Sequence, residues 1–419
     1  MSFNFDVYPK VVRRGRETEI KVEGIYPGMR FDPERRYIIR LFSKVDKREE
    51  ISFEIKPEDE RRLSFAYDFK TPGEYRFDLF VEGAHRPIGT FGLFSLEGEL
   101  LSLRPFKGDM HIHTFYSDGA ESPIYMAVRG KELGLDFIAI TDHNKYEPSV
   151  EAIREAERIG LDMLLIPGEE VSTRESCGHI LSINASGWVA GLMEEIERYD
   201  AEVSSIAAEL EGRELVKGLT PRKYAHAVWV VRKIRELGGF AVIAHPYWVA
   251  SRRFDLDRRV YEQLLEDGLY DAVELLGDVA SEDNFLSVAR FMDELQRGRR
   301  PPIIGNSDTH RAHGHTYGRY WTVVFAEELS VEAVLGAIKD HRSVACERPQ
   351  GQNLRVFGPF ELVEYTYFLD RELFPIHDGI CALEGRLFMR VLEGKEGAIM
   401  GELEALKREL KGFYERYFG

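Results

Sequence analysis

Short runs of alternating apolar and polar residues dominate the first 103 positions. The runs ETEIKVEG, RYIIRLFS, EISFEIK, RLSFAYDF and EYRFDLFVE are separated by Pro, Gly and charged residues typical of turns. A period of two places successive side chains on opposite faces of a strand, so these runs predict half-buried strands. Residues 1–103 are therefore expected to form a small antiparallel β-sandwich.

The pattern changes after Pro105, where compact apolar runs alternate with amphipathic helical stretches such as PSVEAIREAERIG and EDNFLSVARFMDELQRG. The seven apolar runs are DMHIH, DFIAIT, DMLLIPGEEVS, HILSIN, FAVIAHP, DAVELLG and PIIGNSD. Alternation of this kind predicts parallel β/α units. Seven strands favour a closed or nearly closed barrel over residues 104–346, although an open doubly wound sheet would leave a similar pattern.

Two further segments depart from the β/α rhythm. Residues 190–222 are long and charged, and they predict a helical insertion. Residues 347–419 begin as a loop and end in the helical pattern EGAIMGELEALKRELKGFYERYFG. The sequence thus predicts three parts, namely 1–103, 104–346 and a C-terminal extension over 347–419.

Composition narrows the location and the partners. The chain has no run of about 18 apolar residues, and MSFNFDVYPK lacks the pattern of a signal peptide, so a cytoplasmic protein without a membrane partner is expected. Cys177, Cys346 and Cys381 are far apart, and free thiols are expected. The formal net charge of −16 would repel a long polyanion, which favours a small-molecule substrate over nucleic acid. The composition does not decide whether the protein forms a homo-oligomer.

Chemistry-bearing residues gather where the predicted strands end. They are His111, His113, Asp118, His143, Glu169, Glu170, His179, His245, Asp308 and His310. A single histidine beside an apolar run is usually a core or surface residue. Six of the twelve histidines, however, fall at strand ends, where the loops of a β/α barrel converge. Imidazole and carboxylate are ligands of first-row metals, so the joint placement predicts a metal centre.

These residues carry a family resemblance. The motifs HIHTFYSDG, TDHN, PGEEVS, GHIL, AHP and NSDTH, in this order, resemble the series of the polymerase and histidinol phosphatase (PHP) superfamily of metallohydrolases over residues 105–346. The preceding β-rich segment, GDMHIHT and HPYW look most like the branch that contains carbaryl-hydrolase-like proteins. The resemblance implies a distorted (β/α)7 barrel with two or three divalent ions, for which zinc, manganese and iron are the candidates.

The resemblance also implies which residues hold the ions. One ion would be held by His111, His113, Glu170 and Asp308; a second by Glu170, His179 and His245; a third by Asp118, His143 and His310. The choice of Glu170 over Glu169 follows a PG-x-E-V pattern. Asp109 is either a partner that orients a histidine or a carboxylate at a strand end facing solvent.

Hydrolysis is the expected reaction, because closely spaced divalent ions generate hydroxide at neutral pH and bind the oxygens of a phosphoester. Proton transfer could be assisted by His143, His310 or Glu169. Residues that could contact the substrate are Arg174, Trp248, Arg252, Arg253, Arg311, Arg319 and His315. Tyr247 and His313 are further candidates, but each could equally serve packing or the loop surface.

Three functions remain in competition. The first is a phosphoesterase acting on a small phosphomonoester or phosphodiester. The second keeps the metals but cleaves an ester, carbamate or amide bond, as the carbaryl-hydrolase branch implies. The third is a binding or scaffold protein without catalysis, which nine candidate ligands on an open rim make the least favoured.

Overall fold

The chain folds into two compact units. The computed structural model describes residues 4–26, 28–175, 177–277, 281–395 and 399–418. The first unit contains residues 1–103, 360–380 and 400–419, and the second contains residues 104–359 and 381–399. The first boundary lies where the sequence pattern changes. Within residues 347–419, 360–380 and 400–419 belong to the first unit, and 347–359 and 381–399 belong to the second.

The first unit contains two sheets. The three-stranded sheet has the order β1–β3–β6, with bounds Phe5–Tyr8, Glu17–Gly24 and Arg62–Asp68. The five-stranded sheet has the order β2–β8–β7–β4–β5, with bounds Val11–Arg13, Gly89–Leu96, Gly73–Val81, Tyr37–Ser43 and Glu50–Ile55. Inward residues of both sheets, among them Ile20, Leu63, Ile39 and Phe77, belong to one buried core. The alternating runs of the sequence thus become strands with one buried face.

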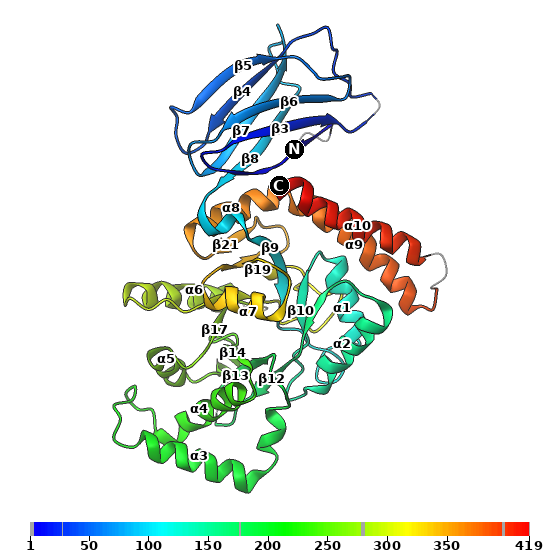
Figure 1. Cartoon of the computed structure of the whole chain (residues 1–419). Coiled ribbons are helices and arrows are strands. Elements are labelled where there is room, and N and C mark those ends of the chain that lie inside the picture. The colour runs from blue at the N-terminus through cyan, green and yellow to red at the C-terminus, as the bar shows by residue number, and fades with distance from the viewer. Residues whose placement is uncertain (1–3, 27, 176, 278–280, 396–398, 419) are drawn as a thin grey trace. The chain divides into compact units, whose positions relative to one another are not determined.

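Helical segments complete the first unit. A 3-10 turn η1 covers Gly98–Leu101, and α8 covers Phe360–Glu372. Helices α9 (Phe374–Leu392) and α10 (Ile399–Phe418) follow, and the unit boundary passes through both. The ring of Phe94 lies 4.8 Å and 5.2 Å, centroid to centroid, from the rings of Tyr365 and Phe368 on α8. Aromatic packing therefore joins α8 to the sheet (Figure 1).

The second unit contains two larger sheets and a hairpin. The six-stranded sheet has the order β11–β10–β9–β19–β20–β21, with bounds Leu164–Ile166, Phe137–Ala139, Arg104–Asp109, Tyr320–Ala326, Ser343–Glu347 and Arg355–Phe357. The five-stranded sheet has the order β12–β13–β14–β17–β18, with bounds Gly168–Ser172, His179–Ile183, Phe240–Ile243, Ala272–Leu276 and Ile303–Gly305. The hairpin pairs β15 (Val249–Ala250) with β16 (Arg253–Phe254).

This arrangement differs from a closed ring of parallel strands. The second unit is a mixed α/β fold in which β9, β10 and β11 pair in parallel, as do β14, β17 and β18, whereas β12–β13, β13–β14 and β9–β19 pair antiparallel. Residues 173–178 between β12 and β13 are too few for a crossover helix, so these strands must run in opposite directions. The run DMLLIPGEEVS also divides at Pro167 into β11 and β12, which belong to different sheets.

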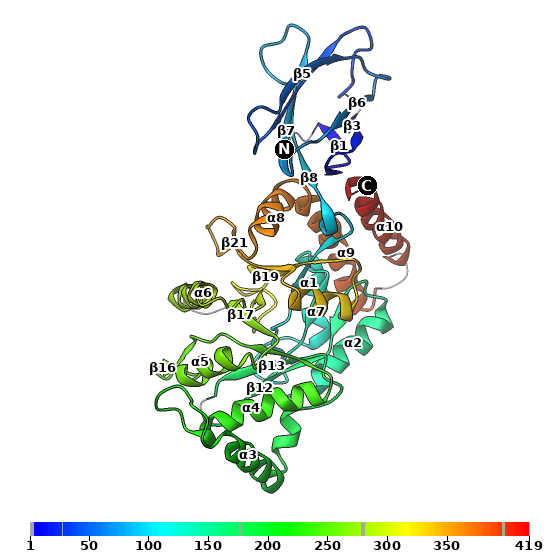
Figure 2. The same cartoon turned by 60° about the vertical axis from the view of Figure 1, so that its left-hand side comes forward.

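Helices cover these sheets close to where the sequence predicts them. Their bounds are Pro123–Glu132 for α1, Glu147–Ile159 for α2, Ile196–Leu210 for α3, Pro221–Glu236 for α4, Arg258–Asp267 for α5, Ser281–Gln296 for α6 and Val331–Lys339 for α7. A 3-10 turn η2 covers Ala190–Met193. Helix α2 ends at Gly160, whose φ of +69° is the left-handed conformation that glycine tolerates. The insertion predicted over 190–222 contains η2 and α3, and α3 packs beside α4 in one buried core (Figure 2).

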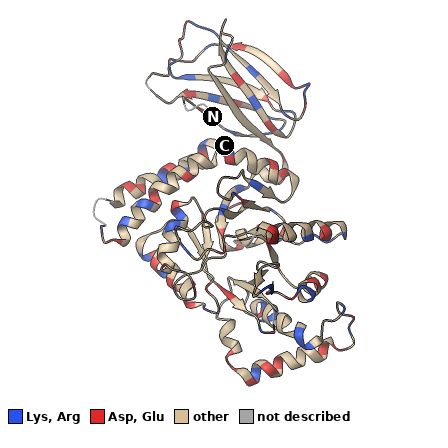
Figure 3. Ribbon diagram, turned by 180° about the vertical axis from the view of Figure 1, so that it is seen from behind, with Lys and Arg blue, Asp and Glu red and all other residues tan. Residues whose placement is uncertain are grey.

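No helix in the described residues is long and apolar enough to cross a membrane. The three cysteines are buried thiols. Basic and acidic residues are interspersed along the helices (Figure 3).

Candidate metal centre

The first two histidines lie just beyond strand β9. This strand ends at Asp109, two residues before His111, so the run DMHIH is mostly not strand. Two hydrogen bonds donated by its backbone amides nevertheless fix the path of this segment. Ile112 N donates to Thr141 Oγ1 at 3.0 Å, and His113 N donates to Thr309 O at 2.9 Å. Alternate residues of an extended segment point the same way, so both histidines face one side.

A buried carboxylate shapes the loop that carries Asp118. Asp142 accepts hydrogen bonds from Thr114 N at 2.8 Å, Ser117 N at 3.1 Å and Ser117 Oγ at 2.6 Å. A Cβ at Gly119 would lie 2.5 Å from the carbonyl oxygen of His113, so the turn back toward the histidine requires glycine. Asp142 lies within the motif TDHN but was not among the predicted site residues.

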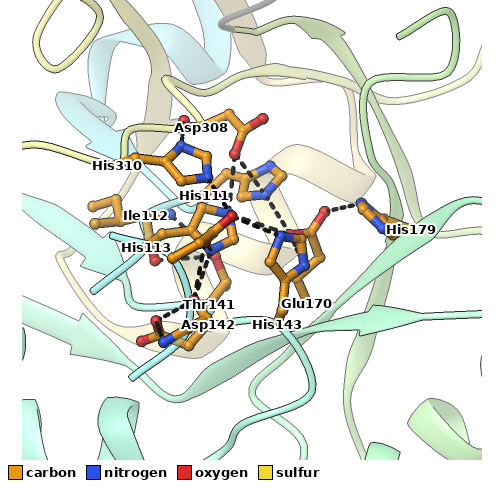
Figure 4. Close-up of polar contacts among 12 residues, drawn as sticks. His111, Ile112, His113, Thr141, Asp142, His143, Glu170, His179, Asp308 and His310 are labelled. Atoms are coloured by element: carbon orange, nitrogen blue, oxygen red, sulfur yellow. Dashed lines mark hydrogen bonds and ion pairs between the residues drawn. The ribbon is translucent and has the colours of Figure 1, made fainter. Parts of the chain in front are cut away.

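Glu170 is the centre of the cluster (Figure 4). Its Oε2 lies 3.2 Å from His111 Nε2, 3.2 Å from His113 Nε2 and 3.0 Å from His143 Nδ1. Its Oε1 lies 2.8 Å from His179 Nδ1 and 3.1 Å from His245 Nε2. The two oxygens of one buried carboxylate therefore face separate groups of histidines.

Asp308 and Asp118 extend the cluster on the other side. Asp308 Oδ1 lies 3.2 Å from His111 Nε2 and 3.0 Å from His113 Nε2. Asp118 Oδ2 lies 3.2 Å from His310 Nε2 and 3.6 Å from His143 Nε2. Side-chain exposure rises from 0% at Glu170 to 36% at His310 and 53% at Asp118, so the cluster opens to solvent at its Asp118 end.

Two of the residues occupy unusual backbone conformations. His245 and Asp308 have φ values of +21° and +47°, in a region of backbone conformation that residues other than glycine rarely adopt. They follow strands β14 and β18, and the turn of the backbone brings their side chains to the same place. Strain of this kind persists where the surrounding structure holds it and is concentrated at functional sites.

The atoms that converge here suit divalent cations. His111 Nε2, His143 Nδ1 and Glu170 Oε2 are buried and have no hydrogen-bond partner within the described chain. Four groups of side chains each offer ligand atoms within 4.8 Å of one another: His113, Asp118, His143 and His310; His111, Glu170 and His245; His111, His113 and Asp308; His143, Glu170 and His179. Cations would satisfy nitrogen and oxygen atoms that are otherwise costly to bury.

The carboxylates of the cluster favour the protonated form of the buried His111, His113 and His245. Burial disfavours charge on His113, but the neighbouring carboxylates of Asp308 and Glu170 raise its pKa to about 10. Burial also opposes the charge on Glu170, yet the neighbouring His111 and His179 lower its pKa well below the usual range. Histidine binds a metal in its neutral form, so uptake of cations must release protons.

Comparison with known families agrees with this geometry. The PHP domain family matches residues 109–297. These residues form a PHP domain. The match confirms the resemblance to the PHP superfamily and includes seven of the nine candidate ligands. The remaining two, Asp308 and His310, lie beyond the matched residues and join the cluster through the contacts described above.

Relatives of the PHP domain are of several kinds. An uncharacterized protein of Methanocaldococcus jannaschii is 27% identical over 188 residues, which cover 40% of this chain and 89% of that protein. The 5'-3' exoribonuclease Rnm of Escherichia coli is 42% identical over 65 residues, which cover 16% of this chain and only 22% of the relative. A two-domain protein of Bacteroides vulgatus, described as containing a PHP-like metal-dependent phosphoesterase, has a TM-score of 0.39 at 20% identity, covering 58% of this chain and 65% of that chain. Because Rnm is an exoribonuclease, the similarity of this chain to it argues against the expected absence of a nucleic-acid partner.

Glu169 does not join the cluster of the PHP domain. Adjacent residues of a strand point to opposite faces, and Glu169 points away from Glu170. Its Oε1 accepts a hydrogen bond from Val189 N at 2.6 Å, and its Oε2 accepts one from Ala190 N at 3.2 Å. The structure therefore contradicts the expectation that Glu169 assists proton transfer and gives it the task of holding the start of η2.

Glu169 should make the stability of the metal-free protein depend on pH. Burial raises its pKa from 4.5 to about 7. Below pH 4.5 the group is protonated in both the folded and the unfolded chain; as pH rises toward 7 only the unfolded chain releases the proton, so stability falls. At about 1.4 kcal/mol per pH unit the loss approaches about 3 kcal/mol. Glu169→Gln, a neutral isostere, should remove this loss in denaturation measured across pH, and an unchanged slope would contradict the assignment.

Glu274 is a buried carboxylate that the sequence analysis missed. It lies on β17 in the run DAVELLG, where a lone charged residue among apolar ones was the available signal. Its Oε1 accepts hydrogen bonds from His111 Nδ1 at 3.1 Å and Asn306 Nδ2 at 2.9 Å, and its Oε2 accepts one from His245 N at 2.8 Å. Bonding through Nδ1 leaves His111 Nε2 free to face the cluster.

Asp109 accepts hydrogen bonds from backbone amides. It is fully buried, which excludes the expected alternative of a solvent-facing carboxylate. Its Oδ1 accepts hydrogen bonds from His111 N at 3.2 Å and Ser307 N at 3.0 Å. Asp109 thus orients the chain segment that bears His111, while the ring of this histidine bonds to Glu274.

The predicted substrate residues divide into three groups. Trp248 lies against the cluster, with ring centroids 5.4 Å from His245 and 6.0 Å from His179. Arg174 is engaged elsewhere, because it donates to Met193 O at 3.2 Å and its guanidinium lies 4.8 Å from the centroid of the Tyr199 ring. The others lie at least partly exposed on loops or the β15–β16 hairpin, and are Arg252, Arg253, Arg311, His315 and Arg319.

Tyr247 and His313, the two further candidates for contacting the substrate, make other contacts. Tyr247 is buried and packs edge-on against Phe254 and Tyr261. His313 is exposed, and its Nε2 lies 3.1 Å from the hydroxyl of Tyr125.

Proposed function

We propose that this protein is a metal-dependent phosphoesterase that hydrolyses a small phosphomonoester or phosphodiester. The observation that carries the proposal is Glu170, whose Oε2 and Oε1 face different histidine groups and so suit two adjacent cations. Divalent ions held there would activate water for hydrolysis and neutralise charge on phosphoryl oxygens. We assign the nine residues inferred from the sequence as their ligands.

The charge of the cluster supports an anionic substrate only when cations are bound. Glu170, Asp308 and Asp118 contribute three carboxylates, which by themselves would repel a phosphate. Two divalent ions supply four positive charges and reverse the local sign. The exposed end at Asp118 and His310 is the side from which a substrate can reach the cluster.

When cations are bound only at the two oxygens of Glu170, His310 is not a ligand and is suited to proton transfer at this open end. Its Nδ1 lies 2.9 Å from the carbonyl oxygen of Asp308 and donates to it, which leaves Nε2 as the acceptor. Nε2 faces Asp118 at 3.2 Å. His143, which is partly exposed between Glu170 and Asp118, is the second candidate for this task.

A related activity on nucleotides is favoured by exposed aromatic side chains. Phe115 and Tyr116 lie between two candidate ligands, are exposed to 54% and 39%, and stack with ring centroids 4.8 Å apart. Aromatic faces stack on bases without sequence preference. Together with the similarity to the 5'-3' exoribonuclease Rnm, they make short RNA oligonucleotides a second candidate substrate. The net charge of −16 argues against long strands.

The test combines elemental analysis with a substrate comparison. Protein purified without added metal should contain zinc, manganese or iron, and a chelator should abolish activity that the same metal restores. Turnover of p-nitrophenyl phosphate or a short oligonucleotide should exceed that of p-nitrophenyl acetate and a p-nitrophenyl carbamate. His143→Ala should lower kcat about a hundredfold or more without unfolding the protein, whereas His85→Ala, an exposed histidine of the first unit, should not.

Faster turnover of the carboxyl ester or carbamate would instead assign the protein to the second class of hydrolase. Metal binding without turnover of any substrate would favour the scaffold alternative.

A further inference from the structure

Helix α6 exposes its apolar side and buries its polar side. Five polar residues of this helix are at most 7% exposed, namely Asp283, Asn284, Ser287, Arg290 and Glu294. Four large apolar residues are exposed to between 39% and 50%, namely Phe285, Leu286, Met292 and Leu295. A surface helix ordinarily shows the reverse, with its apolar stripe facing the core.

The buried polar side is fixed by specific hydrogen bonds and ion pairs. Asn284 exchanges two hydrogen bonds of 3.0 Å with the backbone N and O of Gly277. Glu294 binds Arg290 Nη2 at 3.0 Å and Arg299 Nε at 2.5 Å. Breaking buried pairs of this kind is costly, so the helix cannot rotate to hide its apolar side.

The exposed side forms a continuous stripe. Phe285, Val288, Met292 and Leu295 are separated by three, four and three positions, the spacing of a helix seam that packs against another helix. A groove of about 240 Å³ adjoins the stripe and is lined mainly by Leu295, Phe291, Pro301, Ile303 and Pro359. Helix α6 stands at the edge of the second unit in both views (Figures 1 and 2).

We propose that α6 is a dimer interface that pairs antiparallel with α6 of a second copy of this chain. A two-fold axis requires a self-complementary surface. The exposed Glu282 lies at the N-terminal end of the stripe, and the exposed Arg300, which also lines the groove, lies at its C-terminal end, so antiparallel pairing places opposite charges together. The small exposed Ala289 lies near the midpoint, where the helices would approach most closely.

The local charge pattern matters because two identical chains with a net charge of −16 repel each other at long range. Apolar burial along the stripe and ion pairs at both ends must overcome this repulsion. Unlike a generic apolar patch, the stripe therefore selects a partner that carries the same pattern in the opposite direction.

The first test is the mass of the full-length protein over a concentration series, by sedimentation velocity or light scattering. Wild type should be dimeric, and Met292→Glu should be monomeric while keeping the far-UV circular dichroism spectrum of the folded protein. The matched control is Met400→Glu, because Met400 on α10 is exposed to 44%, close to the 48% of Met292. A wild-type monomer at every concentration, or a dimer that survives Met292→Glu, would overturn the proposal.

The second test addresses the direction of pairing. Glu282→Arg and Arg300→Glu should each weaken the dimer, and the double variant should restore it because the ends again carry opposite charges. A parallel arrangement would not place these two residues together, so a double variant no tighter than the single ones would reject antiparallel pairing. Binding of a different protein by a monomeric wild type would likewise replace the second copy as occupant.

Discussion

Glu170→Gln is expected to lower kcat/KM for phosphoester hydrolysis about a thousandfold, which corresponds to about 4 kcal/mol of transition-state stabilisation. Glutamine keeps the shape of glutamate but removes a negative charge and one acceptor oxygen. Because Oε2 and Oε1 of Glu170 face separate histidine groups, one substitution affects both sides of the cluster. Elemental analysis should show fewer ions per chain alongside the kinetic loss.

The neighbouring residue provides a matched control. Glu169→Gln makes the same chemical change one position away, on the opposite face of β12, where the side chain bonds to Val189 N and Ala190 N. It should retain metal content and activity. Equal losses in the two variants, or full metal content and activity in Glu170→Gln, would contradict a bridging role for Glu170.

Glu274→Gln is expected to weaken metal binding about 10- to 100-fold, the usual effect of removing a hydrogen-bond partner behind a metal ligand. All three groups around Glu274 are donors, so the amide NH2 of glutamine must face one of them. Either His111 loses the bond that fixes its tautomer, or the strained backbone at His245 loses its acceptor. Competition with a chelating dye measures the change in affinity.

Asp271→Asn separates this effect from general destabilisation. Asp271 is a buried carboxylate immediately before β17, and its Oδ2 accepts a hydrogen bond from Ala241 N at 2.9 Å, far from the cluster along the same strand. This variant should lose stability without losing metal affinity. If both variants lower stability equally and leave metal affinity unchanged, Glu274 serves only the fold.

Local sequence patterns were sufficient for helices such as α2 and for most strands. Helix α2 follows the periodicity of PSVEAIREAERIG and ends at the glycine that closes this run, because capping and amphipathic spacing are properties of neighbouring residues. Strand direction was less predictable. The antiparallel β12–β13 pair depends on how a short connection turns. Helix α6 buries its polar side because of partners such as Gly277 and Glu262 that lie outside its own sequence.

The candidate site shows the same division. The sequence by itself determined which residues offer metal-binding atoms and that they recur at strand ends, since residue type and local periodicity are written in the chain. Only the tertiary structure decided that Glu169 turns away, that Arg174 is held by Met193 O and Tyr199, and that Glu274 supports His111. The physical reason is that hydrogen bonds between residues more than a hundred positions apart, such as the one between His111 and Glu274, leave no local pattern from which either partner can be recognised.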